Sequence, residues 1–220
     1  MSLTLYYHPL SSYCHKALIA LYELGVPFEP KLTNLGDATD RATLSAIWPL
    51  CKFPVLRDHA RERDVAESTI IIEYLDHHFA GAQRLIPGDW ETALEARLWD
   101  RFFDNYVQGP MNQMVVDRMS GGQGDMSRAR ATLDTAYAML ETHMELRIWA
   151  AGETFSVADC AAAPALFYAE SVQPFPANCA HLRAYTECLY ARPSVARVLA
   201  EAKPYFSMFP FQEALAPRFR

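Results

Sequence analysis

The chain has 220 residues and a net charge of −6, from 20 Lys and Arg against 26 Asp and Glu. This balance argues against a nucleic-acid-binding protein, which normally presents a basic face. Apolar residues make up 51% and charged residues 21%, a composition that supports a folded core and excludes global disorder. The longest stretch without charged residues, 1–15, is too short to span a membrane and lacks a basic leader, so we expect neither a membrane span nor a secretory signal.

The cysteines predict neither a disulfide framework nor a structural zinc site. Their number is odd and no two are spaced as Cys-x-x-Cys, a pattern that fits a reducing, cytoplasmic setting. His77 and His78 lie at the end of a predicted helix, where imidazoles interact with the helix dipole, and we expect no metal site. The five cysteines are Cys14, Cys51, Cys160, Cys179 and Cys188.

The first 80 residues alternate between strand and helix patterns. Two prolines, Pro27 and Pro30, place the second strand at a sheet edge. Strand, helix and strand at the start of the chain predict a small mixed sheet with a βαβ beginning. The predicted elements are strand 3–7, helix 12–24, strand 26–32, helix 39–47, strand 53–57 and helix 68–79.

We interpret residues 81–90 as a linker, because they contain residue types that interrupt helices and strands: Gly81, Pro87 and Gly88. Every later segment has helical periodicity, and we expect a kink at Pro164. The predicted helices are 91–119, 127–150, 156–168, 179–191 and 194–202, followed by an irregular tail from residue 204.

A turn rich in serine separates the first strand from the first helix. Ser11 and Ser12 lie where a hydroxyl either caps the backbone N–H groups or helps to hold an anion at the positive end of the helix. The residue types alone leave both interpretations open.

Two later motifs are typical of peptide recognition. Lys52-Phe53-Pro54-Val55 contains a candidate cis-proline, which would leave the adjacent backbone free to pair with an extended peptide ligand. Glu67-Ser68 opens an apolar helix, either as a helix cap or as a receptor for an amino-acid head group, with a carboxylate for the ammonium and N–H and O–H donors for the carboxylate.

Together these motifs, in this order and spacing, resemble the cytosolic glutathione S-transferase family over essentially the whole chain. The serine turn is similar to that of the serine-type classes, including the zeta class, and the subclass stays open. Trp48 and Cys51 depart from the family's usual Asn-Pro-x-Gly-Lys. The other matching segments are the capping box Phe155-Ser156-x-x-Asp159, the linker Leu85-Ile86-Pro87 and Arg97-x-Trp99.

The resemblance implies an α/β thioredoxin-like domain at residues 1–80, a linker at 81–90 and an all-α domain at 91–220. It implies a cytoplasmic, homodimeric detoxification enzyme that uses glutathione as co-substrate and needs no metal. Ser11 is our first choice for the hydroxyl that donates to the glutathione thiolate, Ser12 the second and Tyr7 the third. The implied glutathione-binding residues are Lys52, Phe53, Pro54, Val55, Glu67 and Ser68, and the pocket for a small hydrophobic electrophile is assigned to Tyr106, Met111, Met114, Val115, Phe167 and Phe206.

Two alternatives stay open from the sequence. Some members of such a family are non-catalytic binding or interaction proteins, and others are glutathione-dependent isomerases or dehalogenases on the same scaffold.

Overall fold

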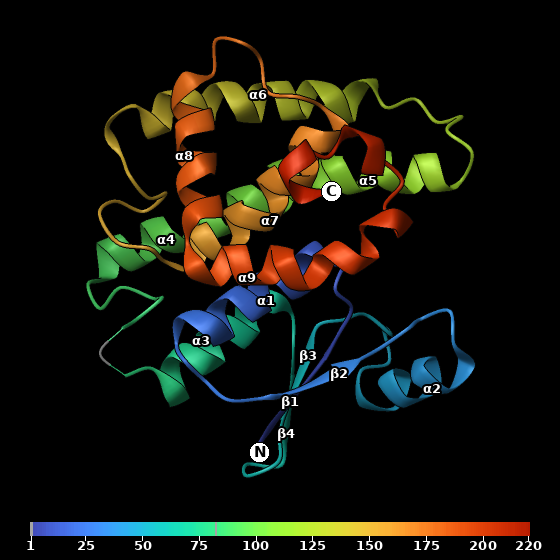
Figure 1. Ribbon diagram of the computed structural model, residues 1–220. Coiled ribbons are helices and arrows are strands. Elements are labelled where there is room, and N and C mark those ends of the chain that lie inside the picture. Colours follow the sequence, from blue (N-terminus) through green and yellow to red (C-terminus); the bar gives the residue numbers. More distant parts are fainter. Residues whose placement is uncertain (1, 82) are drawn as a thin grey trace.

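The computed structural model describes residues 2–81 and 83–220. Within these residues, every β-strand lies in the first 80 positions of the chain (Figure 1). The helices α1 and α3 of this part lie between the sheet and the helical part of the chain in Figure 1. The elements are β1 (Leu3–Tyr7), α1 (Ser12–Glu23), β2 (Glu29–Leu32), α2 (Ala38–Ile47), β3 (Val55–Asp58), β4 (Arg63–Ala66) and α3 (Ser68–Phe79).

The sheet has the order β2-β1-β3-β4. β1 pairs in parallel with β2 through the crossover helix α1, whereas β3 runs antiparallel to both β1 and β4. The predicted edge position of the proline-containing strand is therefore confirmed. The sequence prediction missed β4, because Arg63 and Asp64 are exposed and only Val65 of this strand is buried, so the strand has no apolar alternation to detect.

The second part of the chain is helical, which confirms the predicted architecture. The single helix predicted at 91–119 is divided by the π-helical segment η1. The helix predicted at 127–150 ends at His143 instead, because residues 147–152 form a turn in which Trp149 pairs with Gly152. The helices are α4 (Trp90–Phe102), η1 (Phe103–Gln108), α5 (Gly109–Met119), α6 (Ser127–His143), α7 (Val157–Val172), α8 (Ala180–Ala191) and α9 (Pro193–Ala202), followed by the 3-10 turns η3 (Lys203–Met208), η4 (Gln212–Ala214) and η5 (Pro217–Phe219).

Helix α7 is buried along nearly its whole length and packs against α1, so one hydrophobic core joins the two parts. The predicted capping box opens this helix. The Ala158 N–H donates to Ser156 Oγ, and Asp159 Oδ2 accepts from the Ser156 N–H at 2.9 Å. Within the described ranges, no helix has both the length and the apolar character needed to cross a membrane.

Candidate functional site

The turn between β1 and α1 is organised by Ser11. Its backbone is extended, and its Oγ accepts a hydrogen bond from the Cys14 N–H at 3.3 Å, so Ser11 is the N-cap of α1. Ser12 is the first residue of the helix and is buried. The cap uses a lone pair of Ser11 Oγ, and the hydroxyl hydrogen can donate either to the Cys14 thiol or to a ligand.

The Phe53–Pro54 peptide bond is cis, in agreement with the sequence prediction, and β3 begins directly after it. Lys52 is exposed and Phe53 half-buried, whereas Val55 is fully buried and pairs with Tyr6 and Ala66 in the sheet. The side chain of Val55 is thus part of the core.

Glu67 precedes α3 with an unusual backbone, φ 67° and ψ 119°. A positive φ is costly for a residue with a side chain, and such residues concentrate at functional sites. The Glu67 carboxylate makes no capping hydrogen bond and is exposed. Helix capping therefore does not explain this residue, and its carboxylate is available to a ligand.

A pocket of about 570 Å³ lies where the α/β part meets α4 and η1. Five of the six predicted glutathione-binding residues line it, and Val55 does not. The lining residues are Tyr13, Trp48, Lys52, Phe53, Pro54, Glu67, Ser68, Thr69, Ile70, Glu73, Arg97, Asp100, Arg101, Asp104 and Asn105.

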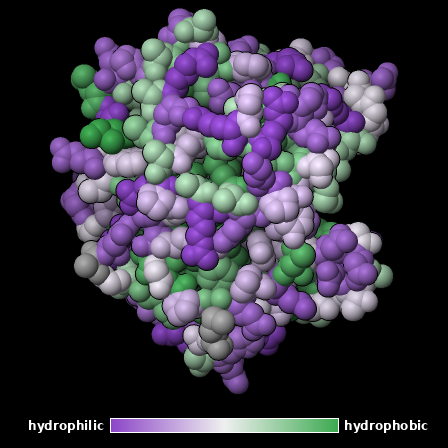
Figure 2. All heavy atoms as spheres, viewed as in Figure 1, coloured by the Kyte–Doolittle hydropathy of each residue, from purple (hydrophilic) through white to green (hydrophobic). Residues whose placement is uncertain are grey.

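A second pocket, of about 370 Å³, contains both candidate serines and shares Tyr13 and Phe53 with the first. Its walls come from the serine turn, from α5 and α7, and from the C-terminal segment. Figure 2 shows the surface hollowed between α2 and the helical part. The lining residues are His8, Leu10, Ser11, Ser12, Tyr13, Phe53, Gln108, Met111, Asn112, Val115, Met119, Tyr168, Met208, Phe209 and Pro210.

Of the six residues assigned to the electrophile pocket, Met111 and Val115 line it and four do not. Met114, Phe167 and Phe206 are buried in the core, where the Phe167 and Phe206 rings stack at 5.6 Å. Tyr106 is 53% exposed and lines a different groove of about 480 Å³ between η1 and α6. The structure does not bring these four residues into the second pocket, because a helical pattern does not distinguish a pocket wall from packed core or from an outer face.

Tyr7 lines neither of these two pockets. It is half-buried, and burial together with the charge of Glu201 raises the pKa of its hydroxyl. This placement favours the serines over Tyr7.

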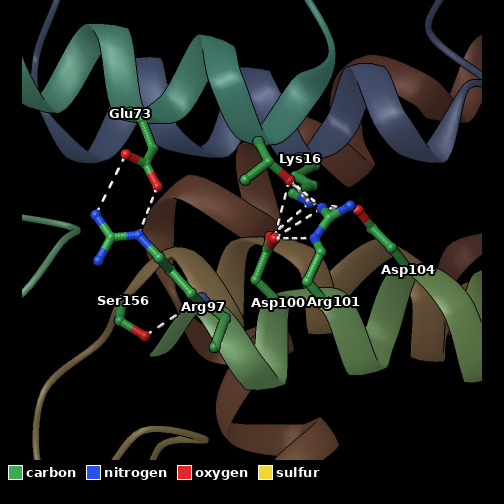
Figure 3. Close-up of polar contacts among 9 residues, drawn as sticks. Lys16, Glu73, Arg97, Asp100, Arg101, Asp104 and Ser156 are labelled. Carbon is green, nitrogen blue, oxygen red and sulfur yellow. Dashed lines mark hydrogen bonds and ion pairs between the residues drawn. The ribbon is translucent and has the colours of Figure 1, made fainter. Parts of the chain in front are cut away.

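A cluster of charges that the sequence prediction missed forms one wall of the first pocket (Figure 3). Lys16 Nζ, from α1, lies 2.6 Å from Asp100 Oδ1 and 2.8 Å from Asp104 Oδ2. Arg101 also pairs with both aspartates, and Thr69 of α3 accepts from Lys16 Nζ at 2.8 Å. Two cations thus face two anions. In the sequence, the only signals of this charge cluster are the spacing of Asp100 and Asp104 and the presence of a lysine, Lys16, within an apolar helix.

Two titratable groups at the start of α1, Tyr13 and Cys14, stay protonated at neutral pH. Burial raises the pKa of the Cys14 thiol to about 12, and burial together with the charge of Asp104 raises the pKa of Tyr13 to about 12. Cys14 is therefore not a thiolate nucleophile. Among residues 2–81 and 83–220, no group of three or more His, Cys, Asp and Glu side chains is placed to hold a metal ion.

Two family models match the chain. The N-terminal domain of glutathione S-transferases matches residues 5–83, and their C-terminal domain matches residues 115–188. The chain is 32% identical to a glutathione S-transferase-like protein of a Fusarium species over 146 residues, which are 64% of this chain and 66% of the relative. It is 25% identical to glutathione S-transferase U28 of Arabidopsis thaliana over 202 residues, 89% of this chain and 88% of the relative.

A solved structure is also similar. A glutathione S-transferase from Methylobacterium radiotolerans, in complex with glutathione sulfonate, superposes with a TM-score of 0.77 at 27% identity, covering 89% of this chain and 93% of that one.

Proposed function

This chain belongs to the glutathione S-transferase family, and we propose that it transfers a small hydrophobic electrophile to the sulfur of glutathione. One observation carries the proposal. The pocket lined by Glu67 and the pocket lined by Ser11 lie side by side, with Tyr13 and Phe53 lining both. A tripeptide held in the first pocket can therefore direct its thiol toward the serine turn and the second pocket.

We assign the γ-glutamyl end of glutathione to the start of α3. The free Glu67 carboxylate pairs with the ligand ammonium, and the helix N-terminus at Ser68 supplies N–H and O–H donors for the ligand carboxylate. The residues around the cis-proline, Phe53 and Pro54, form the wall along which the extended peptide lies. The bound glutathione in the Methylobacterium neighbour's complex is a sulfonate derivative, which supports this ligand class.

Ser11 is the proposed activator of the thiol. A free thiol has a pKa near ~8.5, and lowering it by about two units needs about 2.7 kcal/mol of preferential thiolate stabilisation. The Ser11 hydroxyl, available as a donor beside the N-terminus of α1, combines a hydrogen bond with the helix dipole. Ser12 is the second choice, since it lines the same pocket but is buried.

We also propose a cytoplasmic homodimer with a detoxifying role. Helices α4, η1 and α6 carry exposed apolar side chains. Two of these residues, Tyr106 and Met139, also line the groove between η1 and α6. The exposed residues are Leu94, Leu98, Tyr106 and Met139. A stable second copy would bury this surface. Light scattering that gives the monomer mass of 24.9 kDa at micromolar concentration would contradict the dimer.

The function is tested with the intact protein, glutathione and chlorodinitrobenzene, together with retention on immobilised glutathione. Conjugation with retention supports a transferase. Retention without conjugation, and without thiolate absorbance, would favour a binding protein instead. Failure of both would overturn the proposal.

A further inference from the structure

His8 opens the serine turn directly after β1. Its carbonyl oxygen accepts a hydrogen bond from the Ser11 N–H at 3.0 Å. A turn closed by this bond holds the Cα atoms of its first and fourth residues within about 7 Å of each other. His8 and Ser11 both line the 370 Å³ pocket. The imidazole of His8 is therefore a near neighbour of the proposed thiolate donor.

The backbone decides which ring nitrogen of His8 carries the proton. Nδ1 accepts a hydrogen bond from the Leu10 N–H at 3.2 Å, so the neutral ring carries its hydrogen on Nε2. Burial lowers the pKa of His8 below its usual value of 6.5, which keeps the ring neutral at pH 7. His8 therefore offers one donor, the Nε2–H, and no free acceptor.

Nε2 of His8 is accessible to a ligand. Within residues 2–81 and 83–220, the hydrogen bonds of His8 are those of its backbone and of Nδ1, and Nε2 makes none. The side chain is half-buried, and Nε2 is not one of the buried atoms that lack a partner. Two aromatic neighbours hold the ring in place: Phe53 stacks on it at a centroid distance of 6.0 Å, and Tyr205 meets it edge-on at 5.7 Å. The donor is thus oriented, open and unused.

We infer that His8 is a further catalytic residue of the proposed reaction, and that its Nε2–H donates to the glutathione sulfur together with the Ser11 hydroxyl. The inference rests on the proposed transferase function. The Ser11 hydroxyl hydrogen can also donate to the Cys14 thiol, which accepts from the His8 backbone N–H at 3.5 Å. The Nε2–H has no such competing acceptor among the described residues, so a bound thiolate receives its full strength.

The step moves one proton and forms no bond to the protein. The glutathione S–H gives its proton to water, and the thiolate that remains accepts from Nε2–H and from Ser11. His8 keeps its own hydrogen throughout, because the lone pair of Nδ1 is engaged by the Leu10 N–H. A hydrogen bond to an ionised acceptor is about twice as strong as one to a neutral acceptor. The donor therefore favours the thiolate and lowers the pKa of the thiol.

The experiment titrates the thiolate absorbance of bound glutathione in the intact parent and in variants of His8. His8→Phe keeps a ring for the stack with Phe53 but has no N–H. It should raise the thiol pKa by about one unit and lower kcat with chlorodinitrobenzene near neutral pH by about ten-fold. His8→Gln places an amide nitrogen near the position of Nε2 and cannot act as a base, so it should restore more than half of both losses. KM for glutathione should change by less than about two-fold in either variant.

His143→Phe is the matched control. His143 is also a half-buried imidazole stacked on an aromatic ring, that of Trp99, at a centroid distance of 3.7 Å. Its Nε2 pairs with the Ala150 carbonyl oxygen at 2.7 Å, and it lines neither of the two pockets. Its replacement should lower the stability and leave the thiol pKa unchanged. It therefore separates a general weakening of the fold from the loss of a donor at the sulfur.

The outcomes separate the inference from the function. If the parent forms the thiolate and His8→Phe has the same thiol pKa, or if His8→Gln shifts it as far as His8→Phe, the inference fails and the transferase function stands. If the parent shows neither thiolate nor conjugation and is not retained on immobilised glutathione, both fail. Should His8→Phe not fold, His8→Asn takes its place, because it keeps an acceptor for the Leu10 N–H and does not reach the position of Nε2. The same rise in thiol pKa is expected, and its absence overturns the inference.

Discussion

Lys16 and Asp104 are 88 positions apart in the chain and form an ion pair of 2.8 Å between Nζ and Oδ2. The lysine lies on α1 and the aspartate on η1, so the pair joins the α/β part to the helical part. Lys16 is only 1% exposed, and a buried charge is tolerated only when it is paired. Because Asp104 also lines the first pocket, the pair fixes one wall of the proposed glutathione site.

Replacing Lys16 by Met should therefore lower the free energy of unfolding by about 3 kcal/mol or more, because two buried aspartates would then share only Arg101. Arg57→Ala is a suitable control. Its pair with Asp64 spans 3.7 Å between half-exposed side chains and should contribute only about 0–1 kcal/mol. Urea unfolding measures both. Equal stability of Lys16→Met and the parent would mean that Arg101 alone neutralises both aspartates.

The sequence predicted the fold, and it pointed to five residues that line the first pocket, because these signals are local. The serine turn, the cis-proline segment and Glu67-Ser68 are each a few residues long and keep their order. Lys16 was missed because a lysine in a helix looks like a solvent-facing residue until its partners, 84 and 88 positions later, are placed. Contacts of such sequence separation leave no periodic pattern.

Only two of the six residues assigned to the electrophile pocket line the second pocket, for a related reason. A constant helical period over 91–119 assumes that all side chains keep one register, but the π-helix η1 resets it. Tyr106 consequently faces the outer groove, whereas Met111 and Val115, in the α-helix that follows, reach the pocket.

Glu67→Gln should weaken glutathione binding by about ten-fold or more, since it removes a charge-assisted contact to the ligand ammonium. Glu67→Gly should weaken binding equally and also keep or raise the stability, because glycine tolerates the φ of 67° without strain. Glu62→Gly is the matched control. Glu62 has φ 50° but does not line the first pocket, so its replacement should leave binding unchanged. Calorimetric titration with glutathione tests all three, and unchanged affinity in Glu67→Gln would reject the assignment.

Arg118 holds the C-terminal segment beside the second pocket. It donates to Glu213 Oε1 at 2.6 Å, and its guanidinium lies 4.2 Å from the Phe211 ring centroid. Met208, Phe209 and Pro210, which precede this attachment, line the pocket. Arg118→Ala should therefore raise KM for the electrophile by about three-fold and leave KM for glutathione unchanged.

Arg218→Ala serves as the control for this prediction. Arg218 ties the end of the same tail to Glu187 of α8 at 2.5 Å, and it does not line the second pocket. Its loss should change neither KM. If both variants raised KM for the electrophile equally, general loosening of the tail would explain the effect better than the position of Arg118.

His15 should make the stability depend on pH in mildly acid solution. Its ring is buried, and Nε2 donates to the Pro9 carbonyl at 2.5 Å. Burial lowers the pKa of this imidazole from 6.5 to about 4. Below pH ~6.5 the unfolded chain binds a proton that the native state does not, so stability falls as the pH is lowered toward about 4. The loss between pH 7 and pH 5 is about 2 kcal/mol for this group.

The measurement compares the parent with His15→Gln, which keeps a donor for the Pro9 carbonyl but does not titrate. Urea unfolding at pH 7 and pH 5 should show a smaller loss of stability in the variant. Identical losses in the two proteins would assign the acid sensitivity to other groups.

Ser11 has two separable roles, as helix cap and as proposed thiolate donor, and substitutions distinguish them. Ser11→Ala removes both, so it should lower stability by about 1 kcal/mol and raise the pKa of bound glutathione. Ser11→Gly removes the hydroxyl but remains an acceptable cap, so it should reproduce the change in thiol pKa at a cost of only a few tenths of a kcal/mol. In both variants kcat should fall near neutral pH and recover partly as the pH rises, because solvent then deprotonates the thiol.

Ser12→Ala should leave the thiol pKa near that of the parent. The absorbance of bound thiolate, titrated in each variant, decides the matter. An unchanged thiol pKa in Ser11→Gly, with a raised one in Ser12→Ala or Tyr7→Phe, would assign the donor to another hydroxyl.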